Sequence, residues 1–287
     1  MKNLCIALVC IAVAACSVQK NNPSGENWIQ LFNGKDLDGW DIKITGYPLN
    51  ENFNNTFRVE KGILRASYDQ YRVFDGEFGH LFYTEKFSYY KLRIEYRFTG
   101  DQVNGGPGWA KRNSGVMIHS QSAASMDKDQ SFPTSIEVQF LGGLGDGERP
   151  TGNLCTPGTH VMIKDSLFTP HCINSVSKTF NGDQWVEAEA IVLGDSVIFH
   201  LINGDTVLSY QKPQLDDQDA NYLKMYQHFG SRYLKVGYLA LQAESHPVEF
   251  RKVELLNLEG CTDPKALNYK DFFVKSDNSK CVYKKKN

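Results

Sequence analysis

Glu137 and Gln139 stand two residues apart within residues 136–140, a run in which apolar and polar side chains alternate. Successive side chains of a strand point to opposite faces, so these two are predicted to share the polar face of one strand. A carboxylate can serve as a general base or a metal ligand, and an amide can bind a hydroxyl group. We therefore expect Glu137 to be a catalytic base or metal ligand and Gln139 to bind substrate.

An imidazole and a second acid extend this set. His119 ends a similar run at residues 116–119, and an imidazole titrates close enough to neutral pH to be an acid, a base or a ligand. The alternative is a histidine at the surface end of a strand. Glu244 and Gln242 lie near the last predicted strand and are expected to complete the same groove. Glu244 is a further catalytic candidate, and Gln242 is a candidate substrate ligand.

Glu95 and Arg97 alternate with apolar residues in residues 93–98 and are also candidates for substrate binding. Together, these side chains predict a polar row on the outer face of a curved sheet, which makes a groove suited to a polyol. The alternative is a solvated sheet face on which Glu95 and Arg97 pair with each other.

The elements that must position these residues are strands. Alternating runs recur along the chain, at residues 93–98, 116–119, 136–140, 197–202 and 248–258. An Asn-Gly pair at residues 203–204 is a strong signal for a tight turn. No comparable run repeats at helical spacing. We predict an all-β fold, a two-sheet jelly-roll β-sandwich.

Composition and charge limit the partners. The 287 residues include 31 Lys and Arg against 33 Asp and Glu, for a net charge of -2. Nucleic-acid binding needs a concentrated basic surface, so we expect no nucleic-acid partner. Only the N-terminus carries a long apolar run, which argues against an integral membrane protein.

Residues 1–15 predict a lipoprotein signal peptide. Lys2 precedes an apolar stretch, residues 4–15, that is too short to span a bilayer and ends in small residues before Cys16. An ordinary cleaved signal peptide is the alternative. We expect Cys16 to carry lipid, residues 16–27 to be a flexible tether, and the protein to be exported and anchored at the bacterial outer membrane through that lipid alone.

The remaining cysteines suit an exported protein. Cys155, Cys172, Cys261 and Cys281 would stay in the mature chain, and four cysteines allow three pairings. Proximity in sequence favours the disulfides Cys155–Cys172 and Cys261–Cys281, which persist in an oxidising compartment. The spacing contains no Cys-x-x-Cys pair, which argues against a zinc site.

Several short motifs occur in a fixed order over most of the chain, at residues 31–40, 57–64, 92–98, 113–117, 136–140, 151–152, 184–185 with 203–204, 237–242 and 247–251. In this order the sequence resembles the 3-keto-disaccharide hydrolase family, from about residue 28 to residue 258. His119 stands where many members have Arg, and Glu244 stands where many have His. The resemblance implies a jelly roll related to concanavalin-like lectins and glucanases, and an enzyme acting on sugars oxidised at C3.

This resemblance implies a particular chemistry. A ketone at C3 acidifies the C2 proton, so a base can remove it and expel the C1 aglycone; addition of water to the resulting glycal completes a net hydrolysis. The expected partner is an oxidised (3-keto) glycoside or a related carbohydrate. Two alternatives remain: a non-catalytic carbohydrate-binding surface lipoprotein, and a glucanase-like endo-hydrolase. The second would need a tight acid pair on one strand, but Glu137 is followed by Gln139.

Residues 259–287 form a separate small unit with two cysteines. It resembles a module appended to exported proteins of Bacteroidetes-like bacteria, and a disulfide is expected to close it because it is too small for a core. Its Asp and Asn residues predict either a structural Ca²⁺ site or ordinary turn chemistry. A catalytic divalent metal bound by the polar face is the other cofactor that the sequence leaves open.

Overall fold

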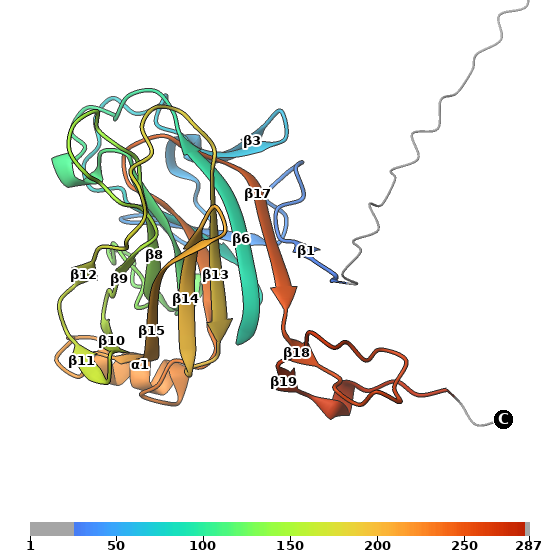
Figure 1. Cartoon of the computed structure of the whole chain (residues 1–287). Helices are drawn as coiled ribbons and strands as arrows, with labels where there is room; N and C mark the ends of the chain where they lie inside the picture. Colours follow the sequence, from blue (N-terminus) through green and yellow to red (C-terminus); the bar gives the residue numbers. More distant parts are fainter. Residues whose placement is uncertain (1–25, 285–287) are drawn as a thin grey trace, which may run out of the picture.

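The computed structural model describes residues 26–284, so the predicted signal peptide, Cys16 and most of the tether lie outside the described residues. Two antiparallel sheets pack face to face, and a small C-terminal unit follows the last long strand (Figure 1). The predicted all-β two-sheet sandwich is confirmed. Among residues 26–284, no helix is long and apolar enough to cross a membrane.

The larger sheet has ten strands and contains most of the long ones. In spatial order these are β11 (Ser166–Phe168), β10 (Thr159–Ile163), β15 (Asp205–Leu215), β14 (Val197–Ile202), β13 (Val186–Leu193), β6 (Tyr89–Phe98), β17 (Val248–Asn257), β4 (Ile63–Ala66) and β3 (Phe57–Glu60), with β1 (Ile29–Gln30) paired to β17.

The smaller sheet has seven strands. In spatial order they are β12 (Cys172–Ile173), β9 (Asn153–Cys155), β8 (Ile136–Leu141), β7 (Asn113–Ser120), β16 (Tyr238–Ala243), β5 (Gly79–Tyr83) and β2 (Trp40–Ile44). The helical elements are short: η1 (Phe53–Asn55), η2 (Gly108–Ala110), η3 (Ala123–Ser125), α1 (Tyr222–Phe229) and η4 (Asn278–Lys280).

The two sheets use their outer faces differently. In β6, buried and half-buried residues alternate without exception, so one side packs in the core and the other meets solvent. In β7, all eight residues are buried. The outer face of β7 is covered because Met117 packs with Ala123, Met126 and Phe132 of the segment that follows. Residues of this segment therefore cover part of the outer face of the seven-stranded sheet.

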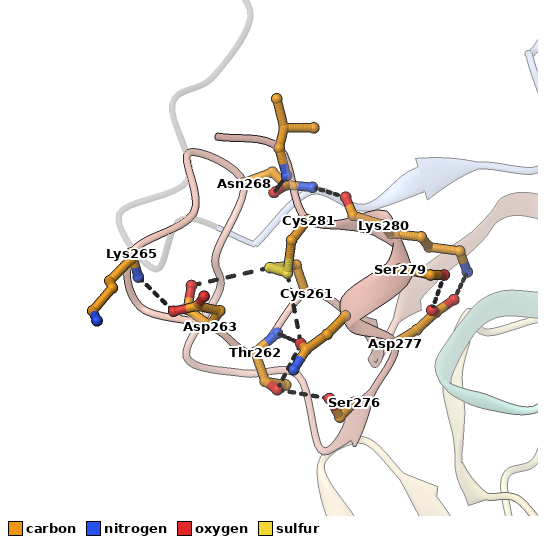
Figure 2. The surroundings of a disulfide bond; sticks show 12 residues. Cys261, Thr262, Asp263, Lys265, Asn268, Ser276, Asp277, Ser279, Lys280 and Cys281 are labelled. Carbon is orange, nitrogen blue, oxygen red and sulfur yellow. Dashed lines mark hydrogen bonds and ion pairs between the residues drawn. A yellow bond between two sulfur atoms is a disulfide. The ribbon is translucent and has the colours of Figure 1, made fainter. Parts of the chain in front are cut away.

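The C-terminal unit is held by a disulfide and side-chain hydrogen bonds rather than by a core. β18 (Glu259–Gly260) pairs in parallel with β19 (Lys275–Ser276), and Cys261 is bonded to Cys281 (Figure 2). Asp263 accepts hydrogen bonds from the backbone N–H of Lys265 (2.9 Å) and the hydroxyl of Tyr283 (2.7 Å). The Asp263 carboxylate thus already accepts hydrogen bonds within the unit, as in an ordinary turn, and calcium binding here stays a prediction.

Candidate active site

A cavity of about 420 Å³ opens on the outer face of the seven-stranded sheet, beside the part that Ala123, Met126 and Phe132 cover. This volume lies in the range of pockets that hold small ligands. It is lined by Trp109, Asn113, Phe132, Glu137, Gln139, Leu141, Arg149, Cys155, Pro157, His171, Cys172 and Glu244. The side chains come from β7, β8, β9, β12, the end of β16 and the loops around them, and they include Glu137 and Glu244, the two carboxylates that the sequence selected as catalytic.

Glu137 reaches across its neighbouring strand because that strand has no side chain at the crossing point. Gly115 of β7 is paired with Gln139, and a Cβ atom added to Gly115 would lie 2.8 Å from Oε1 and 3.1 Å from Cγ of Glu137. The Glu137 side chain is 5% exposed and its Oε1 has no hydrogen-bond partner. Burial disfavours the charged form and raises the pKa of Glu137 to about 8.

Glu244 follows the last residue of β16 and lies within electrostatic range of Glu137. It is also buried, at 3% exposed, and its Oε2 also lacks a partner. Its pKa is raised well above the ordinary value, first by burial and then by repulsion from Glu137, while Arg149 acts in the opposite direction. Two such carboxyl groups resist ionising together, so the pair retains a proton at neutral pH. One ionised and one protonated carboxyl can act as base and acid.

Glu244 is followed by a residue in an unusual backbone conformation. Ser245 has φ of 81°, a left-handed value that costs on the order of 1–3 kcal/mol for a residue other than glycine. Its backbone N–H donates to the Tyr68 hydroxyl (2.7 Å), and the Gln102 amide donates both to Ser245 Oγ and to the carbonyl of Pro107, each at 2.9 Å. These bonds hold the strained residue and link it to the loop that carries Trp109.

Aromatic rings form one wall of the cavity. Trp109 is 55% exposed, and its ring stacks on Phe78 with centroids 5.6 Å apart. Phe78 in turn contacts Phe132 at 5.0 Å. An exposed Trp braced in this way offers a rigid, flat, apolar surface of the kind that anchors ligands.

The two predicted amide ligands take different positions. Gln139 lines the cavity, and its Oε1 accepts a hydrogen bond from Asn153 (3.1 Å). Gln242 lies in the same sheet but is 0% exposed, and neither its Oε1 nor its Nε2 has a partner.

His119 does not share the polar face with Glu137, so that expectation of the sequence is wrong. It has φ of 48° at a register shift between β7 and β16, which breaks the alternation from which its direction was inferred. Its Nε2 lies 3.0 Å from the carbonyl of Gly194, in the hairpin between β13 and β14 of the other sheet. His119 is therefore fully buried and does not line the cavity.

Contrary to expectation, Glu95 and Arg97 do not lie on the sheet that carries Glu137, because β6 belongs to the ten-stranded sheet. They do not pair with each other. Arg97 binds Glu249 (2.7 Å), whereas Glu95 binds Lys252 (2.5 Å) and Arg251. Their outer face is a solvated ion-pair network on the opposite side of the sandwich from the cavity, so the prediction that they bind substrate with Glu137 is wrong.

Several lining residues were not selected from the sequence. Asn113, whose Oδ1 is buried without a partner, opens a motif that the sequence did single out. Trp109 had a usable signal, since a large aromatic residue follows the Gly- and Pro-rich residues 105–108. Arg149 had none: it lies in a polar loop, and its Nη1 donates to the carbonyls of Arg112 (3.1 Å) and Gly142 (2.5 Å).

Both expected disulfides are present, and one of them borders the cavity. Cys155 and Cys172 are bonded and join β9 to β12. Their sulfur atoms and His171 lie within 4.8 Å of one another, the one cluster of metal-ligand type among residues 26–284. A cysteine binds a metal as a thiolate, and these two sulfurs are bonded to each other, so this cluster is a wall of the cavity and not a metal centre.

A paired-carboxylate cavity on the face of a β-sandwich is suited to acid–base chemistry on a small bound molecule. Residues 27–256 match the model of the 3-keto-alpha-glucoside-1,2-lyase-like domain, so the chain belongs to this family and is carbohydrate-active. A comparison with curated proteins found no match. The two disulfides indicate an extracytoplasmic protein.

Solved structures with a similar arrangement include two candidate glycosyl hydrolases from Parabacteroides distasonis. One has 17% identity and a TM-score of 0.44 over 80% of this chain and 93% of its own; the other has 16% identity and a TM-score of 0.47 over 80% and 99%. The Bacillus licheniformis beta-glucanase is similar at 11% identity and a TM-score of 0.44, over 82% of this chain and 100% of its own.

Proposed function

We propose that the protein cleaves 3-keto-glycosides by elimination, with Glu137 as base and Glu244 as acid. Only Glu244 carries the added repulsion of a neighbouring carboxylate, so Glu137 is the first of the two to ionise. The observation that carries the proposal is this buried pair, with an unpartnered oxygen on each residue, at a sugar-sized cavity.

The proposed reaction balances on these two groups. Glu137 removes the C2 proton, and the electron pair of the C–H bond moves toward the C3 ketone as an enolate. The enolate collapses to a C1–C2 double bond while the C1–O bond breaks, and Glu244 gives its proton to the leaving oxygen. Water then adds to C1 and a proton returns to C2, so the net result is hydrolysis. Arg149 lies beside the pair, where its positive charge favours developing negative charge.

Product analysis in deuterated water tests this proposal. With a 3-keto-glucoside as substrate, elimination places deuterium at C2 of the product, whereas direct displacement at C1 does not. Glu137→Gln should abolish turnover. Glu95→Gln is a matched control, because Glu95 lies on the other sheet, and it should retain turnover. Full activity of Glu137→Gln would remove Glu137 from the mechanism.

The same incubations separate the other readings. Sugar binding without turnover would support a carbohydrate-binding lipoprotein, and cleavage of unoxidised glycan would support an endo-hydrolase. A divalent cation stays a prediction: Glu137, Glu244 and Asn113 present unpartnered oxygens, the ligand type of Mg²⁺ and Ca²⁺, and such an ion would polarise O3 of the substrate. Loss of turnover in a chelator, restored by the metal, would support it.

We also propose that the protein is anchored by lipid on Cys16. The support is the sequence of residues 1–16, which lie outside the described residues, together with disulfides that suit an exported chain. Cys16→Ala should move the protein from the membrane fraction to the soluble fraction, and a wild-type protein that is already soluble would refute the anchor.

A further inference from the structure

Next to the cavity, two neighbouring side chains bury polar atoms without partners. His80 of β5 and Gln242 of β16 are cross-strand partners, and both are 0% exposed. Both ring nitrogens of His80 and both amide heteroatoms of Gln242 lack a hydrogen-bond partner among the described residues. Buried polar groups in folded proteins are nearly always paired, and an unpaired one costs stability. We therefore expect a ligand that forms hydrogen bonds with these atoms.

The pair is continuous with the catalytic cavity. Phe132 lines the cavity, and its ring centroid lies 5.9 Å from that of His80. Leu241 pairs with Val116, so the next step in register brings Gln242 to Gly115, over which the Glu137 carboxylate lies. Unpartnered atoms thus run in one row from Glu137 through Gln242 to His80.

The chemistry of the pair selects its ligand. Burial and the neighbouring Lys43 lower the pKa of His80 to about 3, so its ring is neutral and offers one donor and one acceptor. The Gln242 amide likewise offers both. A carboxylate or phosphate could satisfy only the donors, and an ammonium only the acceptors. A hydroxyl both donates and accepts, so two neighbouring hydroxyls of a sugar satisfy all four atoms.

We propose that His80 and Gln242 form an inner subsite that binds two hydroxyl groups of the sugar whose reacting carbons lie at Glu137. The subsite rests on the proposed function for the orientation of that sugar. Because both side chains are fully buried, the residues that cover them have to move aside when the sugar binds.

Apolar replacements of similar size separate a ligand subsite from a structural role. His80→Phe and Gln242→Met remove unpaired polar atoms, so the ligand-free variants should melt at the same temperature as the wild type or higher. Turnover of a 3-keto-glucoside by either variant should show roughly a tenfold increase in KM, as expected for lost hydrogen bonds to the substrate.

His200 provides the matched control. It is also 0% exposed, but its Nδ1 bonds the Gly152 carbonyl (2.9 Å) and its Nε2 bonds the Tyr210 hydroxyl (2.8 Å). His200→Phe leaves the Gly152 carbonyl and the Tyr210 hydroxyl without their hydrogen-bond partner, and it should lower the melting temperature. If His80→Phe lowers it as much as His200→Phe does, His80 is structural and the subsite is wrong. A stable His80→Phe variant with an unchanged KM also overturns the subsite.

Failure of the proposed function is distinguishable from failure of the subsite. If the wild type does not turn over a 3-keto-glucoside, binding of methyl α-glucoside is followed by its effect on the melting temperature. A stabilisation of the wild type that His80→Phe abolishes supports the subsite without the reaction. No stabilisation of the wild type, or an equal stabilisation of the variant, overturns it.

Discussion

Replacing Glu137 with Gln is expected to make the protein more stable, and the gain should depend on pH. Burial raises the pKa of Glu137 from 4.5 to about 8. At about 1.36 kcal/mol per pKa unit, this difference corresponds to roughly 5 kcal/mol by which the ionised carboxylate destabilises the folded protein. Gln has nearly the same shape without the charge, so it removes this penalty.

The direction in which stability changes with pH depends on whether the folded or the unfolded chain releases the Glu137 proton at lower pH. Below pH 4.5 the carboxyl group is protonated whether the chain is folded or not, and it causes no penalty. Between pH 4.5 and about 8 the unfolded chain has lost the proton while the folded protein keeps it, so wild-type stability falls as pH rises. The advantage of Glu137→Gln should therefore grow across this window and level off above it.

Urea denaturation of both proteins at several pH values between about 5 and 9 measures the difference directly. Glu95→Gln is a control for which the expected change in stability is opposite. Burial acts to raise the pKa of Glu95, but hydrogen bonds and charges from Lys252 and Arg251 outweigh it and lower the pKa. Glu95 therefore contributes stability that is lost as pH falls, and its variant should be slightly less stable near neutral pH. A pH-independent difference for Glu137→Gln would falsify the assignment of a buried, uncompensated carboxylate.

The remaining predictions concern turnover and the cavity wall. kcat/KM for a 3-keto-glucoside should rise with pH with a midpoint near the Glu137 pKa of about 8; a profile already flat from pH 6 would exclude Glu137 as the base. Trp109→Ala should raise KM about tenfold and lower the melting temperature only slightly, because the ring is 55% exposed and loses little beyond its stacking on Phe78; an unchanged KM would mean that it does not contact the sugar. Replacing Cys155 and Cys172 with Ser should lower the free energy of unfolding by about 3 kcal/mol, since the bond joins residues 17 apart; unaltered denaturation curves would contradict this.

Local alternation was enough to predict five of the longer strands and, where a strand is unbroken, the direction of its side chains. Glu137 and Gln139 do share a face, because residues two apart on an unbroken strand must. The same rule failed at His119, where positive φ and a register shift reverse the direction of the side chain. Nothing in the sequence of residues 116–119 marks that irregularity, which depends on how β7 meets β16.

The sequence by itself determined that this is an all-β chain with polar side chains on one face of several strands, because the period of a strand is local. Only the tertiary structure decided which sheet each strand joins, and so it separated Glu95 and Arg97 from Glu137. It also decided that Glu244 meets Glu137 and that both are buried. The pKa of Glu137 is raised by desolvation, and that of Glu244 by desolvation and by a neighbour distant in sequence; neither cause exists until the sheets pack.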